Sequence, residues 1–189
     1  MHLILNSFES VIRHNHDLFE QLALKHNYHE ALLKIANYAK DLKLIKSSMS
    51  IIAALCGARR QQVGRFLKLK LLTTIKAHLQ NTVFVHDSTS SVSSEDKEMI
   101  EEIHTESLIA LSNIACDDKV QGIVDLLIAS SIFSDAVFPL YFNENTSFRM
   151  KHELAFCVCN SLLKCSFEEA CRLMSSGHYM KIIVDVLQL

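Results

Sequence analysis

Two stretches of this sequence repeat one another, and an internal repeat restricts the folds open to a chain more than any other feature. Segments 106–113 and 153–160 align without gaps, and each runs from a Glu to an Asn. The two Asn residues, Asn113 and Asn160, lie 47 residues apart. Periods of this length are typical of helical units that bury their apolar faces only by stacking on one another. The repeat therefore predicts a stack of three-helix units.

The remaining pattern of the sequence is helical. Only four Gly and one Pro occur, too few for the turns of an all-β protein. The stretch 80–94 is polar and aperiodic, which predicts a loop insertion with an edge strand at 83–85 as the alternative, and Ser94 is expected to cap the helix after it. Gly57 is expected to end a helix as its C-terminal cap. Apolar spacings of three and four residues predict helices over 47–56, 66–79, 94–115, 119–129, 133–141, 148–163, 168–174 and 179–187.

Length and charge restrict the class of protein. At 189 residues we expect a single domain over 1–189. The formal charge of −2 argues against nonspecific nucleic-acid binding. The locally basic stretch from Arg59 to Lys76 is interpreted as a solvated helix face, with a specific anion site as the alternative. No apolar run approaches the roughly 20 residues of a membrane helix, and no signal peptide is recognised. We expect no membrane partner and a place in the cytoplasm and nucleus.

Motifs for catalysis and for metal binding were also considered. The chain contains no G-x-S-x-G, P-loop or H-E-x-x-H pattern, so we expect neither enzymatic activity nor a cofactor. The C-terminal third suggests a zinc hypothesis, which involves Cys157, Cys159, Cys165, Cys171, His152 and His178. Residues two apart on a helix point to different faces, and no C-x-x-C pair occurs. Buried free thiols are therefore the preferred interpretation, with no metal.

The repeated segment resembles the third helix of the armadillo repeat, and within that superfamily it is most similar to importin-α, whose pattern is E-A-x-W-A-L-S-N-I. The second copy matches more loosely, with Cys157 in place of an Ala, and an earlier copy over 54–57 has Gly in place of the Asn. The resemblance implies an all-α, right-handed armadillo-type α-solenoid of about three and a half repeats, over 16–57, 58–116, 117–164 and 165–189. The best match consists of Glu106, Ala110, Leu111, Ser112, Asn113 and Ile114.

In that family the third helices line a concave groove that holds an extended basic peptide, the nuclear localisation signal. An Asn amide can bond a peptide unit as donor and acceptor, and a Trp one turn earlier packs on Lys and Arg stems. This chain has no Trp, and the corresponding positions hold Ala53, Ile109 and Phe156. No acidic lining is expected, since Thr105 and His152 lie one turn before two of these positions. The peptide-binding residues implied are Asn113, Asn160, Phe156, Ile109 and Ser112.

The resemblance thus implies a non-enzymatic module that binds a peptide or protein, and an importin-α-like nuclear transport adaptor in particular. An importin-β-type carrier would be a further partner. The alternative is an armadillo- or HEAT-like scaffold that binds folded proteins without recognising a signal peptide. The apolar last helix over 179–187 has no further helix to cover it, so self-association through this C-terminal end is also expected.

Overall fold

The computed structural model describes residues 2–58, 60–80, 93–117, 122–163 and 165–188. These ranges are 86% helical and contain no strand. The helices are α1 (His2–His14), α2 (His16–His26), α3 (Tyr28–Tyr38), α4 (Leu42–Ala58), α5 (Arg60–Lys68), α6 (Leu71–Gln80), α8 (Ser94–Ala115), α9 (Ile123–Ser130), the π-helix η1 (Phe133–Val137), α10 (Phe138–Phe142), α11 (Phe148–Leu163), α12 (Phe167–Met174) and α13 (His178–Leu187).

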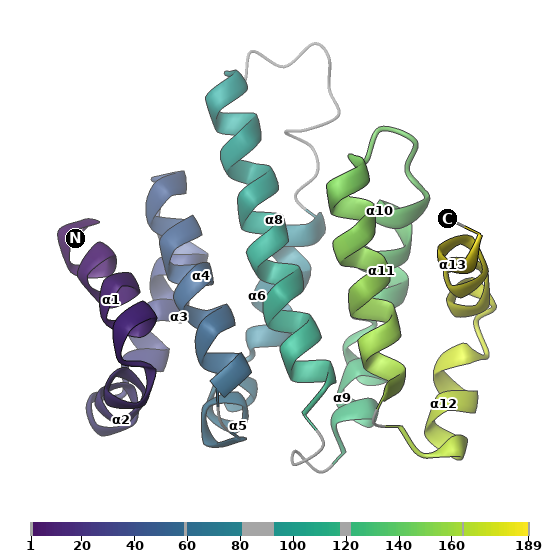
Figure 1. Ribbon diagram of the computed structural model, residues 1–189, viewed down its shortest axis with the longest axis horizontal. Helices are drawn as coiled ribbons and strands as arrows, with labels where there is room; N and C mark the ends of the chain where they lie inside the picture. The colour runs from purple at the N-terminus through teal and green to yellow at the C-terminus, as the bar shows by residue number, and fades with distance from the viewer. Residues whose placement is uncertain (1, 59, 81–92, 118–121, 164, 189) are drawn as a thin grey trace.

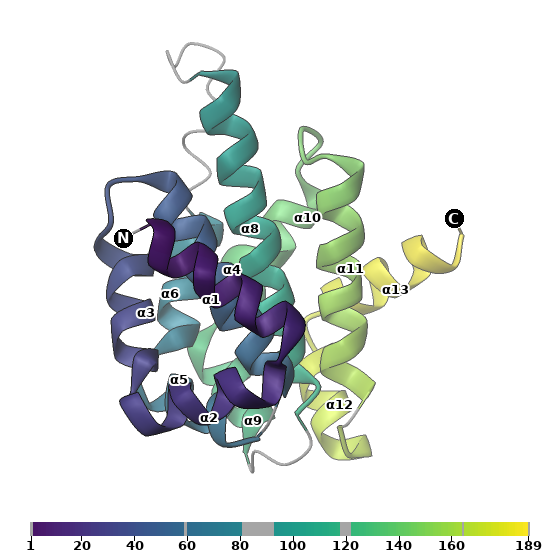
Figure 2. The ribbon, with the colours of Figure 1, turned by 60° about the vertical axis from the view of Figure 1, so that its left-hand side comes forward.

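The described helices form three rows, and the repeats α2–α4, α5–α8 and α9–α11 each contribute to all three. The third helices α1, α4, α8 and α11 lie side by side across the front of the molecule, with the two termini at opposite ends (Figure 1). The second helices α3, α6 and η1 with α10 lie behind them, whereas α13 lies beside α11 at the C-terminal end and projects away from the row (Figure 2). The first helices α2, α5, α9 and α12 run along one edge. The all-α solenoid predicted from the repeat is confirmed.

A residue in the left-handed backbone region separates the first helix from the second in every repeat. These residues are Asn27, Lys70, Ser131 and Gly177, with φ of 53°, 65°, 53° and 72°. The single helix predicted over 66–79 is wrong, because α5 ends at Lys68 and α6 begins at Leu71. A left-handed Lys costs about 1–2 kcal/mol, and nothing in the local sequence indicates it.

Two predicted caps differ from the structure. Ser93, not Ser94, caps α8, because its Oγ accepts a hydrogen bond from the Asp96 amide at 3.1 Å. Gly57 is not a C-cap, since α4 continues through Ala58 and Gly57 keeps a negative φ. The predicted loop insertion and its alternative strand at 83–85 fall mainly within 81–92, outside the described residues.

The core runs the length of the stack. Met49, Ile52 and Leu55 of α4 are fully buried, as are Leu108 and Leu111 of α8. Burying each such side chain stabilises the fold by roughly 1.5–3 kcal/mol. Because α8 packs against both α4 and α11, each repeat depends on its neighbours for this burial.

Candidate functional site

The third helices expose one common surface, here called the third-helix face. It consists of the outward residues of α4, α8 and α11, which recur at spacings of three and four. On α4 these residues are Lys43 and Lys46 at one end, then the small residues Ser50, Ala54 and Gly57. On α8 they are Glu98, Glu102, Ile109 and Asn113. On α11 they are Phe148, His152, Phe156, Cys159 and Leu163.

The α8 part of the third-helix face is acidic over its first half. Glu102 lies one turn after Glu98 and carries its carboxylate 3.8 Å from Lys46 Nζ of α4. The first turn of α8 adds Glu95, whose carboxylate lies 3.1 Å from Lys43 Nζ. The side chains of these pairs are about one-third exposed or more, so each pair is worth little on its own. The acids lie on the first half of α8, where the sequence analysis expected none.

The expectation of a non-acidic face came from choosing the wrong residue in the preceding turn. Thr105 lies four positions before Ile109, but its side chain is buried, and its Oγ1 donates to the Glu101 carbonyl at 2.9 Å. Glu102, seven positions before Ile109, occupies the outward position instead. Seven residues make almost two full turns, so Glu102 returns closely to the side of Ile109, whereas four residues overshoot one turn by about 40° and turn Thr105 toward the interior. The sequence therefore contained this signal.

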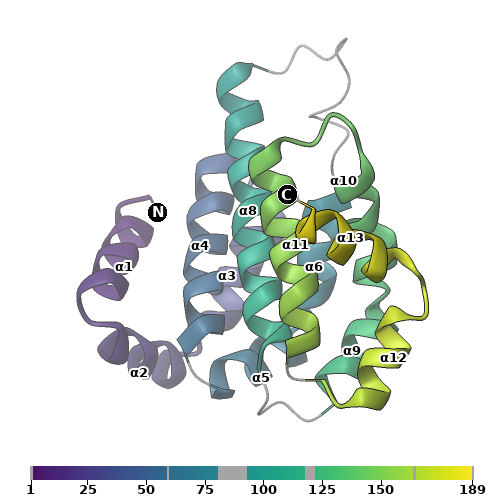
Figure 3. The ribbon, with the colours of Figure 1, turned by 45° about the vertical axis from the view of Figure 1, so that its right-hand side comes forward.

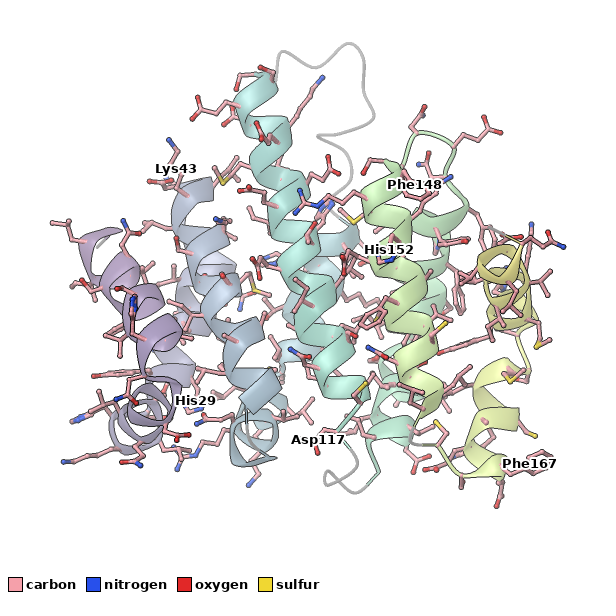
Figure 4. The ribbon with its side chains drawn as sticks, in the orientation of Figure 1. His29, Lys43, Asp117, Phe148, His152 and Phe167 are labelled. Atoms are coloured by element: carbon pink, nitrogen blue, oxygen red, sulfur yellow. The ribbon has the colours of Figure 1, made fainter. Side chains whose placement is uncertain are left out.

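The α11 part of the third-helix face is aromatic and apolar. Phe148 is 74% exposed and Phe156 is 54% exposed, two turns apart on one side of the helix. His152 lies between them, and Figure 4 shows Phe148 and His152 projecting outward from α11. Leu163 continues the row at the far end of the helix. Exposed aromatic rings in a row can stack against planar or cationic side chains of a partner.

Asn113 uses its side-chain amide within the fold. Its Nδ2 donates to the carbonyl oxygen of Ala53 on α4 at 3.0 Å, so the side chain links neighbouring repeats. The Asn113 side chain rests over Gly57, where an added Cβ would lie 3.0 Å from Nδ2. Gly57, which stands where the pattern has Asn, thus leaves room for the Asn113 side chain of the next repeat.

Asn160 is placed differently from Asn113. Its side chain is only 9% exposed, and its Nδ2 donates to Ser112 Oγ on α8 at 2.6 Å. Ser112 is itself buried. Of the predicted peptide-binding residues, Ile109, Phe156 and the half-buried Asn113 therefore lie on the third-helix face. Asn160 and Ser112 lie between α8 and α11, and Phe148, Glu98 and Glu102 are surface residues that the sequence analysis did not select.

The cysteines do not form a cluster. Cys157 is buried, and burial raises the pKa of its thiol well above the ordinary value. Cys159 lies half-buried on another side of α11 and lines a cavity instead. Within the described ranges all six cysteines are free, and no group of three or more His, Cys, Asp or Glu side chains is placed to hold a metal ion.

The basic stretch is distributed over different contacts. Arg65 donates to the Leu24 carbonyl at 3.0 Å, and Lys76 donates to Asp135 at 2.6 Å across to the next repeat.

In the described ranges no single helix is long and apolar enough to cross a membrane. One pair bent by 47°, Ile123–Ser130 with Phe133–Phe142, meets that test by length and composition only.

Comparisons with known proteins identify the fold. A designed armadillo repeat protein in complex with the peptide (KR)4 superposes with a TM-score of 0.72 over 98% of this chain, at 17% identity. Computationally designed armadillo repeat proteins for modular peptide recognition give 0.67 over 92%, at 16% identity. A further engineered protein gives 0.64 over 89%, at 15% identity. This chain spans 66%, 63% and 58% of those chains.

No protein-family model matches the sequence, and no curated protein matches it. The likeness therefore lies in the arrangement of the helices. Three helices per repeat and side-by-side third helices are both seen along the stack. This chain has the fold of the armadillo repeat proteins.

Proposed function

We propose that the third-helix face binds an extended peptide segment of a partner protein. The observation that carries the proposal is the exposed aromatic row of α11 beside the acidic half of α8. Such a surface offers stacking for side-chain stems and negative charge for cationic ends. A non-enzymatic binding module agrees with these features.

The proposed peptide is basic. Glu98 and Glu102 would attract Lys or Arg side chains, and Phe156 would pack against their stems. A structurally similar designed protein is in complex with (KR)4, which supports a basic ligand for this fold. Phe156 follows the motif resemblance, being the aromatic residue at one of the Trp positions of importin-α. On this ground we further propose a nuclear transport adaptor that acts in cytoplasm and nucleus with an importin-β-type carrier.

The test is fluorescence polarisation with a labelled Lys/Arg-rich peptide at low and high salt. We expect binding that weakens as salt rises, because the attraction is between exposed charges. Phe156→Ala and Glu102→Gln should each weaken binding several-fold. Phe167→Ala is the matched control, because Phe167 is highly exposed on α12, away from the third-helix face (Figure 4). Equal affinities for Phe156→Ala and Phe167→Ala would contradict the proposed site.

The roles of Asn113 and Asn160 need a different test. Both amides bond a neighbouring helix, so replacing them by Ala perturbs packing as well as any ligand contact. Lost binding in such variants counts toward a ligand role only where the unfolding midpoint is unchanged. Asn113, which is half-buried on the third-helix face, is the more direct candidate of the two.

A scaffold for folded proteins is the second candidate function. It is favoured by Lys43 and Lys46, which already pair with acids of α8 and reduce their attraction for a basic peptide. Under this alternative the apolar row of α11 is the main contact surface. No binding of basic peptides at high micromolar protein, together with Phe148-dependent binding of a folded partner, would replace the peptide proposal with this one.

A further inference from the structure

Positive charge gathers where the first helices α2 and α5 end. Lys25 lies in the last turn of α2, and Arg65 and Lys68 lie in the last turn of α5. Lys70 follows at the left-handed turn into α6. All four side chains are exposed, and together they are here called the basic edge. Figure 3 shows α2 and α5 toward one end of the lower edge of the stack, and α9 and α12 toward the other.

The repeat brings these cations to one side of the molecule. Counted from the left-handed residue after each first helix, Lys25 and Lys68 occupy the same position in successive repeats. Equivalent positions face the same way in a stack of similar units. Arg65 lies one turn before Lys68, and its Nη1 donates at 3.0 Å to the Leu24 carbonyl, in the peptide bond that joins Leu24 to Lys25. The cations therefore form one surface across the junction of two repeats.

The charge of the basic edge is not balanced within the fold. The residue of α12 equivalent to Arg65 is Arg172, whose Nη1 lies 2.7 Å from the Asp125 carboxylate of the preceding first helix. In α2 the position of Asp125 holds Gln21, and Arg65 bonds a neutral carbonyl instead. Among the residues that the structure describes, none of the four cations forms an ion pair with an Asp or Glu. A partner can therefore supply the missing negative charge.

The basic edge is short. In the two later repeats the positions of its paired lysines hold the uncharged Ala129 and Ser175. The helices α9 and α12 contain more acids than cations, and Glu168 among these acids is exposed. A long polyanion or a flat anionic surface laid along the first helices would be repelled by these acids. The distribution of charge therefore favours a short acidic segment.

We propose that the basic edge binds a short, extended acidic segment of a partner protein. Helices packed side by side lie about 8–10 Å apart, so Lys25 and Lys68 of successive repeats are separated by about that distance. In a polyproline II-type segment, residues three apart share one side and are separated by about 9 Å. The segment therefore carries Asp or Glu at every third position, and consecutive carboxylates pair with the two lysines. Arg65 and Lys70 add positive charge on either side of Lys68.

Fluorescence polarisation of a labelled peptide with the full chain tests this surface. The peptide has Glu at every third position with Pro and Ser between, and a control peptide has Gln in place of each Glu. We expect the Glu peptide to bind at low salt and more weakly at high salt, and the Gln peptide not to bind. Lys25→Gln and Lys68→Gln should each raise the Kd about two- to fivefold, the range of one exposed ion pair.

Two further variants separate the basic edge from the net charge of the chain. Arg172→Gln changes the net charge as Lys68→Gln does, but it removes a cation that Asp125 already balances, so the Kd should stay at the wild-type value. Gln21→Asp keeps every cation and places an acid beside Arg65, as Asp125 lies beside Arg172. It should therefore raise the Kd about as much as Lys68→Gln does.

The outcomes that overturn the proposal are distinct. Equal affinities of Lys68→Gln and Arg172→Gln for the Glu peptide would do so, as would a Glu peptide that does not bind at high micromolar protein. Single-stranded DNA or phosphatidylserine vesicles that bind more tightly than the Glu peptide, with the same dependence on Lys25 and Lys68, would assign the basic edge to a polyanion instead. Binding of the Lys/Arg-rich peptide to the third-helix face should be unchanged in Lys68→Gln, so this proposal and the proposed function can fail separately.

Discussion

The contact between Gly57 and Asn113 supplies a quantitative test of how neighbouring repeats are joined. Gly57 lies within α4, and the Asn113 side chain rests over it while donating to the Ala53 carbonyl. A methyl group at position 57 would lie 3.0 Å from Asn113 Nδ2, closer than an ordinary van der Waals contact. Gly57→Ala therefore places the intrinsic helix preference for Ala in opposition to an inter-repeat hydrogen bond.

The two effects can be estimated separately. Ala in place of Gly stabilises a helix by about 0.5–1 kcal/mol, and near the end of α4 the lower value applies. The Asn113 bond contributes about 1 kcal/mol, which the shifted side chain would lose. We expect Gly57→Ala to lower the free energy of unfolding by about 0.5 kcal/mol in the wild type. In an Asn113→Ala background the same change should raise it by about 0.5 kcal/mol.

Urea unfolding followed by far-ultraviolet circular dichroism measures all four chains of this double-mutant cycle. The expected coupling between positions 57 and 113 is about 1 kcal/mol, within the range found for residues in contact. The same effect of Gly57→Ala in both backgrounds would mean that the Asn113 side chain does not rest on Gly57. The account of how the third helices of successive repeats are joined would then be refuted.

Buried polar groups lead to the remaining predictions. Asn160→Ala leaves the buried Ser112 hydroxyl without its bond, so urea unfolding should show a loss of about 1–3 kcal/mol, partly recovered by adding Ser112→Ala. Burial lowers the pKa of His29 and His78 below 6.5, so the unfolded chain binds protons first as the pH falls. Stability should be complete above pH 6.5 and fall below it, by at most about 1.4 kcal/mol per pH unit for each histidine. Urea midpoints across this pH range measure the slope, and a slope unchanged by His78→Gln would contradict the assignment of His78.

The fold could be predicted because the sequence shows both a repeated motif and a helical spacing of apolar residues. The motif around Asn113 and its looser copy around Asn160 set the period, and apolar spacing placed α8 and α11 correctly. The division between α5 and α6 could not be predicted, because Lys70 adopts a left-handed conformation that Lys rarely takes. Lys70 itself is exposed, so the packing of α5 against α6 on either side sets this conformation, where a local rule would place Gly or Asn.

The candidate site was predicted less completely than the fold. Sequence spacing identifies which residues share a side of a helix, but not whether that side faces solvent or the next helix. Asn113 and Asn160 occupy the same motif position, yet one rests over a glycine and the other is buried against Ser112. The difference lies in the third helix of the preceding repeat. α4 presents Gly57 to Asn113, whereas α8 presents Ser112 to Asn160.

The third-helix face divides into a charged part and an aromatic part. Its charged residues concentrate on α4 and α8, whereas α11 exposes the rings of Phe148 and Phe156. Salt screens the attraction between exposed charges but not the packing of a ring against an apolar side-chain stem. Glu102→Gln should therefore weaken peptide binding at low salt and have little effect at high salt, whereas Phe156→Ala should weaken it at both. Equal salt dependence of the two losses would mean that the acidic and aromatic parts do not act separately on one bound peptide.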